Sequence, residues 1–171
     1  SLAQITVDAN NTAFTSVDGV LFNKDKTELL KYPANKTDES FIMPDSVTII
    51  ASEAFRNCNL TSITIPDRVI SIGDYAFYGC LKLTEIEIPD DVLIGYEAFN
   101  SSGYYHNEAN WENELLYIGK HLIEADGRTA QTVSIKDGTT HIASGVFMDF
   151  ENMTTITIPG SVTSIGERAF Y

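Results

Sequence analysis

Leu60 to Cys80 reads LTSITIPDRVISIGDYAFYGC, and variants of this segment recur along the chain. Two close copies are LTEIEIPDDVLIGYEAF (83–99) and MTTITIPGSVTSIGERAF (153–170). FIMPDSVTIIASEAFRNC (41–58) keeps the later part of the pattern, and VSIKDGTTHIASGVFMDF (133–150) is a looser copy. Recurrence at a fixed period predicts a repeat protein.

The spacing of the copies is regular. Phe55, Phe77 and Phe99 are 22 residues apart, and Phe147 and Phe170 are 23 apart. The 48 residues from Phe99 to Phe147 correspond to one repeat plus an insertion. A period of this size lies in the range of leucine-rich repeats.

Each repeat can be translated into one coil of chain. Ile63 and Ile65 alternate with polar residues, which predicts a half-buried strand. Pro66 has no N–H for a ladder, so the strand ends there in a turn. The chain then returns with Ile72 pointing inward, and GDYAFYGC is expected to place Phe77 in the core on a short helical turn.

A coil of about 23 residues cannot bury its own apolar side chains, so coils must stack to form a continuous core. We therefore predict a β-rich repeat solenoid of the leucine-rich-repeat horseshoe type, with a parallel sheet and short helical turns. A short-repeat β-helix is the rival fold. The side chains that are expected to form a buried aromatic ladder are Phe55, Phe77, Phe99, Phe147 and Phe170.

Two segments interrupt the repeat, GVLFNKDKTELLKYP and ELLYIGKHLIEA, and both place apolar residues around a polar turn. This pattern predicts two inserted β-hairpins. The expected organisation of the single domain, 1–171, is a partial repeat (2–8), a hairpin insert (14–38), repeats 39–59, 60–82 and 83–103, a second hairpin insert (104–130), and repeats 131–152 and 153–171. Because the chain ends at Tyr171 before a repeat is complete, we expect it to be a fragment of a longer array.

The segment ITIPDRVISIGDYAFYGC resembles the BspA-like leucine-rich repeats of bacterial and protist surface proteins. The signature I-x-I-P…V-x-x-I-G-x-x-A-F-x-x-C covers nearly the whole chain, with Lys136 in place of Pro and Phe150 in place of Cys in the looser copy. The resemblance implies a secreted or surface-anchored protein, and some such proteins attach to host matrix proteins or to other bacteria. It supplies no catalytic residues.

The net charge and the lengths of the apolar runs limit the classes of possible partner. The formal net charge of −13 disfavours nucleic acid and anionic membrane surfaces. It suits either a solvated acidic surface or a basic partner. No apolar run approaches the roughly 20 residues of a membrane-spanning helix, so no membrane insertion is expected. We expect a monomer.

The reactive residue types do not form a known site. Cys58 and Cys80 occupy the same slot of successive coils, where packing is the expected role and a disulfide is conceivable. The three histidines, His106, His121 and His141, lack metal-ligand spacing. The sequence therefore predicts no catalytic residues, no metal and no cofactor, and thus no enzyme.

Two surfaces are candidates for ligand binding. The first is the open face of the predicted parallel sheet, and the second is an aromatic loop before the second hairpin. The alternatives are a plain solvated sheet, with Thr chosen for its β-propensity, and a Trp111 that fixes the hairpin to the solenoid. The sheet-face residues are Ser62, Thr64, Glu85, Glu87, Thr132, Ser134, Thr155 and Thr157, and the loop residues are Tyr104, Tyr105 and Trp111.

The functional prediction is a non-catalytic protein-binding or adhesion module that is extracellular or on a cell surface. Its partner would be a protein ligand such as a host matrix protein or another cell's surface protein. The alternatives are a structural spacer that displays other domains and a carbohydrate-binding module centred on Trp111.

Overall fold

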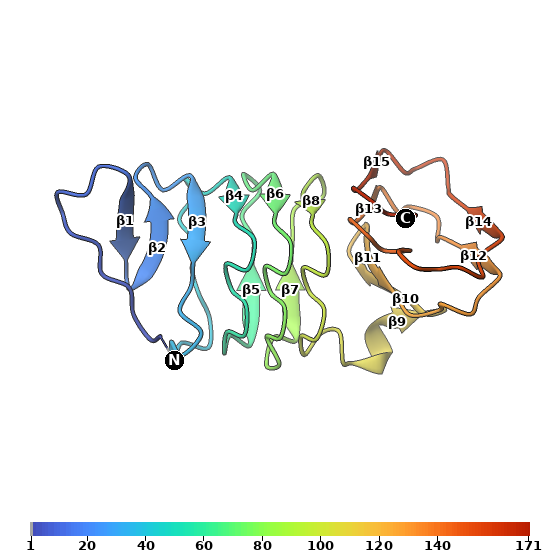
Figure 1. Ribbon diagram of the computed structural model, residues 1–171, viewed down its shortest axis with the longest axis horizontal. Helices are drawn as coiled ribbons and strands as arrows, with labels where there is room; N and C mark the ends of the chain where they lie inside the picture. Colours follow the sequence, from blue (N-terminus) through green and yellow to red (C-terminus); the bar gives the residue numbers. More distant parts are fainter. Residues whose placement is uncertain (1) are drawn as a thin grey trace.

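The computed structural model describes residues 2–171 and shows a β-solenoid with two antiparallel hairpins (Figure 1). The strands are β1 (Phe14–Val17), β2 (Val20–Asn23), β3 (Glu28–Lys31), β4 (Ile49–Ile50), β5 (Ser62–Thr64), β6 (Ser71–Ile72), β7 (Glu85–Glu87), β8 (Leu93–Ile94), β9 (Trp111–Glu112), β10 (Leu115–Ile118), β11 (His121–Ala125), β12 (Thr132–Ser134), β13 (His141–Ile142), β14 (Thr155–Thr157) and β15 (Ser164–Ile165). The predicted fold class is confirmed. Across the described part of the chain, no helix has the length and apolar character needed to cross a membrane.

The coils at 60–82, 83–103, 131–152 and 153–171 each contribute two short strands, whereas the coil at 39–59 contributes β4 and an isolated bridge from Ser40 to Ser62. The I-x-I strands pair in parallel, β5 with β7 and β12 with β14. A second parallel row runs through β4, β6 and β8, with Ile50 opposite Ile72 and Ile72 opposite Ile94. The sequence indicated only that these isoleucines point inward. The second row forms because stacked coils bring their backbone groups into ladder distance.

The segment expected to form a short helical turn is a series of tight turns. Tyr75 and Gly79 have φ angles of 56° and 70°, and residues in this left-handed region cannot continue an α-helix. The turns instead bond to the next coil, as where the N–H of Phe77 donates to the Ala98 carbonyl at 2.7 Å. This turn row is a third line of backbone hydrogen bonds along the solenoid.

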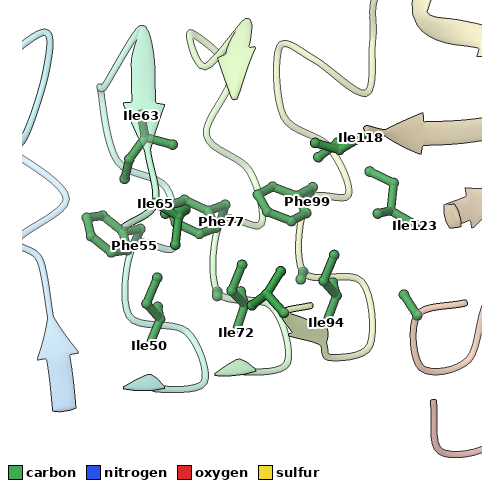
Figure 2. Close-up of a cluster of buried hydrophobic side chains, with 14 of the residues drawn as sticks. Ile50, Phe55, Ile63, Ile65, Ile72, Phe77, Ile94, Phe99, Ile118 and Ile123 are labelled. Carbon is green, nitrogen blue, oxygen red and sulfur yellow. The ribbon is translucent and has the colours of Figure 1, made fainter. Parts of the chain in front are cut away.

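The core is organised around stacked aromatic rings. Phe77 lies between Phe55, with ring centroids 4.7 Å apart, and Phe99, with centroids 5.1 Å apart (Figure 2). Tyr32 of the first hairpin extends the row, because its ring stacks on Phe55 at 5.2 Å. All four rings are buried. The sequence prediction did not include Tyr32, which lies outside the repeat pattern.

The predicted ladder is not continuous, and its last ring is not buried. Phe147 and Phe170 stack at 5.5 Å, but Phe170 is 43% exposed, because no further coil covers it in the structure. Beyond Phe99, the row continues with the aliphatic side chains of Ile118 and Ile123 (Figure 2). The second hairpin therefore separates the aromatic ladder into two parts.

Each inserted hairpin is extended by a third strand into an antiparallel meander. Both meanders join the second row of parallel strands. The strands β1, β2 and β3 form the first meander, and β9, β10 and β11 form the second. The last strand of each meander then pairs in parallel with a repeat strand, β3 with β4 and β11 with β13. Each hairpin thus takes a place in the row as a coil does.

The second hairpin creates a seam in the solenoid. In regular coils the Ile50 carbonyl accepts from the N–H of Gly73 at 2.9 Å, one coil ahead. The Ile94 carbonyl instead accepts at 3.0 Å from the N–H of Ser144, beyond the hairpin. The parallel row accordingly ends at β8 and begins again at β11. Figure 1 shows the first coils from the side and the last coils turned relative to them.

Candidate binding surfaces

The first half of the predicted sheet face is a compact polar patch. Parallel pairing places Ser62 opposite Glu85 and Thr64 opposite Glu87. The Thr64 hydroxyl donates to the Glu87 carboxylate at 3.2 Å. We call these four residues the glutamate face. Three of them are exposed and Ser62 is half-buried, whereas Ile63 between them is buried.

The second half of the predicted face lies in a different sheet. Thr132 is opposite Thr155 and Ser134 is opposite Thr157, and all four side chains are exposed. This threonine face does not pair with β7, because the second hairpin lies between the two sheets in the chain and breaks the row. The eight residues therefore form two patches, separated by the seam.

The aromatic loop packs against the solenoid. The indole N–H of Trp111 donates to the Tyr105 carbonyl at 2.7 Å, and the two rings meet edge to face at 5.2 Å. The Tyr104 hydroxyl donates to the Tyr117 carbonyl of the hairpin at 2.7 Å. Tyr104, Tyr105 and Trp111 are all half-buried, and burial raises the pKa of both tyrosines. These contacts favour the alternative in which the loop fixes the hairpin.

The two cysteines face each other inside the core. The sulfur atoms of Cys58 and Cys80 are 3.1 Å apart, and both residues are buried free thiols. The Cys80 thiol also contacts the Phe55 carbonyl at 3.0 Å. The hydrogen bond between the thiols lowers the pKa of Cys58 and raises that of Cys80. Two buried thiols that face each other and a backbone carbonyl inside the core fit a packing role.

A groove that the sequence did not reveal lies along the seam. One hollow of about 400 Å³ is lined by second-row residues from both sides, including Leu93 and Ile165. A second hollow of about 420 Å³ continues it between Tyr75 and Tyr96 on one side and Met148 on the other. We call the two together the seam groove. The residues common to both hollows are Asp74, Ser144 and Glu167.

Close packing holds the two walls of the groove together. Gly145 has φ +68°, and a Cβ there would lie 2.3 Å from Cδ2 of the Tyr96 ring, so only glycine fits. The exposed Lys120–Asp90 ion pair spans the seam at 2.5 Å. No pattern in the sequence indicated this groove, because its walls come from distant coils. Tyr96 and Gly145 are 49 residues apart in the chain, and Asp74 and Glu167 are 93 residues apart.

A histidine pair lies at the groove. His121 and His141 stack with centroids 4.8 Å apart, and both line the first hollow. His121 is 1% exposed, and neither of its ring nitrogens has a hydrogen-bond partner. Burial, and then the charge of His141, lowers the pKa of His121. The His141 Nδ1 atom is 2.9 Å from the Thr140 hydroxyl.

The half-buried carboxyl of Glu124 lies next to the seam. Glu124 of β11 accepts a hydrogen bond from the Asn100 side-chain amide at 3.2 Å. Burial raises the pKa of Glu124 to about 7. The carboxyl is therefore close to half-ionised near neutral pH.

Comparison with known proteins identifies the repeats. The model described as "BspA type Leucine rich repeat region" matches six copies over residues 32–125 and 125–171. No curated protein sequence matches the chain.

Solved structures share the fold. A leucine-rich repeat protein from Eubacterium ventriosum is 27% identical, with a TM-score of 0.62 over 98% of this chain and 52% of that one. The pneumococcal vaccine antigen PcpA is 26% identical, with a TM-score of 0.61 over 99% of this chain and 38% of that one. A leucine-rich cell surface protein from Faecalibacterium prausnitzii is 24% identical, with a TM-score of 0.57 over 96% of this chain and 41% of that one. The chain thus spans about half or less of these proteins' length.

Proposed function

Because the chain belongs to the BspA-type leucine-rich repeat family, we propose that it is a non-catalytic module that binds protein ligands outside the cell or at a cell surface. The single observation that carries this proposal is the rigid solenoid with the exposed glutamate face. The similar proteins support the location, since one is described as a vaccine antigen and another as a cell surface protein.

The glutamate face is the first of the proposed ligand-binding surfaces. Glu85 and Glu87 project from alternate positions of one short strand, on either side of Ile86, and the strand is fixed by its parallel partner. A surface of fixed carboxylates accelerates association with a basic protein, and the effect weakens as salt screens the charges. The threonine face and the aromatic loop are secondary candidates, and the loop is less suited because the polar groups of Tyr104 and Trp111 are already bonded.

The test is binding to a panel of purified extracellular-matrix proteins, measured by surface plasmon resonance. Against a ligand that binds, Glu85→Lys with Glu87→Lys should slow association markedly at low salt and leave the melting temperature nearly unchanged. The matched control is Asp45→Lys with Asp67→Lys, which makes the same charge change at two exposed turns. Equal slowing in both variants would assign the effect to overall charge, and absence of binding to the whole panel would count against a matrix-binding module.

A further inference from the structure

The seam groove combines the three kinds of group that recognise a basic side chain. The exposed aliphatic side chains of Leu93 and Ile165 line one hollow, and the rings of Tyr75 and Tyr96 line the other. The exposed carboxylates of Asp74 and Glu167 lie where the two meet. Lysine and arginine have an apolar stem and a cationic head, and they pack the stem on apolar surface while the head meets carboxylates or ring faces.

The chain itself shows that this tyrosine surface accepts a guanidinium. Arg56 lies over the Tyr78 ring at 4.9 Å and over the Tyr75 ring at 5.8 Å. Tyr75 also meets Tyr96 edge to face at 5.5 Å, and Tyr96 contributes to the wall of the groove. The ring surface that holds Arg56 is therefore continuous with the surface that lines the groove.

The charge around the groove favours a cation. A smaller hollow shares Tyr96 and Met148 with the groove and adds Glu97, Asp126 and Arg128 to its surroundings. Together with Asp74 and Glu167, these acids outnumber Arg128 and the groove residue Arg168.

We propose that the seam groove binds an extended peptide segment that carries arginine or lysine. This inference rests on the proposed function of protein binding and adds a second, specific contact to the glutamate face. The carboxylates of Asp74 and Glu167 hold the cationic head from opposite walls. The rings of Tyr75 and Tyr96, which are nearly perpendicular to each other, offer one ring face and one ring edge beside the head, and Leu93 and Ile165 contact its stem. The groove exists only because the second hairpin turns the last coils against the first ones.

The test uses a short fluorescein-labelled peptide of alternating glycine and arginine, with a second peptide in which citrulline replaces every arginine. Citrulline has the same shape but no charge. Fluorescence anisotropy should show that the arginine peptide binds at least about fivefold more tightly than the citrulline peptide. The affinity should fall as salt is added.

The variant is Asp74→Asn with Glu167→Gln, and the matched control is Asp45→Asn with Asp67→Asn, which removes two carboxylates at exposed turns outside the groove. Asparagine keeps the acceptor for the N–H of Tyr96, which Asp74 binds at 2.8 Å, so the fold should be preserved. The groove variant should lose about fivefold or more in affinity, and the control should stay within about twofold. Melting curves check that both variants fold.

Equal binding of both peptides, an unaffected groove variant, or no binding at all would each overturn the groove proposal. If matrix proteins are nevertheless captured by the wild type, the proposed function stands and only its location is wrong. If the arginine peptide binds at the groove while no matrix protein is captured, the groove is real and the matrix-binding function fails.

Discussion

Replacement of Phe77 by alanine tests the account of the core most directly. Phe77 is 0% exposed and its ring is stacked on both sides, by Phe55 at 4.7 Å and by Phe99 at 5.1 Å. Removing a buried phenylalanine costs about 3–5 kcal/mol, because the transfer free energy is lost and a cavity remains. Two lost ring contacts place the expected value at the upper end of that range.

The assay is urea denaturation followed by circular dichroism, and the control is Phe170→Ala. Phe170 is 43% exposed and stacks on Phe147 alone, at 5.5 Å, so its loss should cost about 1 kcal/mol. The midpoint should fall much further for Phe77→Ala. A loss below about 1 kcal/mol for Phe77→Ala, or one no larger than that of the control, would refute the stacked-coil core.

Three further predictions follow from individual side chains. Cys58 and Cys80 should react slowly with a thiol reagent in the folded protein and completely, two per chain, after denaturation; rapid labelling of the native protein would show that the core is open. The folded-state pKa of Glu124, about 7, is raised above its ordinary value of 4.5, so the stability that this carboxyl contributes is fully present below pH 4.5 and is lost as pH rises through 7. Glu124→Gln should accordingly raise the melting temperature at pH 8 by an amount equivalent to as much as about 3 kcal/mol and change it little at pH 4, and a pH-independent effect would contradict this. Trp111→Ala should lower the melting temperature through the loss of the bond to Tyr105 and of the ring contact, and a faster ligand dissociation at unchanged stability would instead make Trp111 a binding anchor.

The sequence was most informative where one local pattern was repeated. The alternation at Ile63 and Ile65 predicted a strand, and the recurring phenylalanines predicted rings in equivalent positions of stacked coils. Both follow from the physics of a single coil, because a residue that cannot be buried within its own coil must be buried by the next one. A separate local pattern, apolar residues on either side of a polar turn, predicted the two hairpins.

The local pattern was misleading where backbone groups form hydrogen bonds to a neighbouring coil. GDYAFYGC has the composition of a short helical turn, yet Tyr75 and Gly79 adopt positive φ and the Phe77 N–H bonds to the next coil. A helix would satisfy those groups within the segment, whereas in the solenoid the neighbouring coil offers the acceptor. Tyr32 is a related case, because its aromatic ring joins the ladder from a hairpin that has no repeat pattern.

The sequence by itself determined the family, the coil period and the inward-facing side chains, since each is specified within some 23 residues of chain. Only the tertiary structure decided how the coils are joined across the second hairpin. There, the Ile94 carbonyl accepts from Ser144, the predicted sheet face divides into two patches, and Asp74 and Glu167 meet at one groove. The physical reason is that the seam depends on how an inserted hairpin replaces a coil in the row of parallel strands. This packing joins segments that are distant in the chain, so it produces no periodic pattern in the sequence.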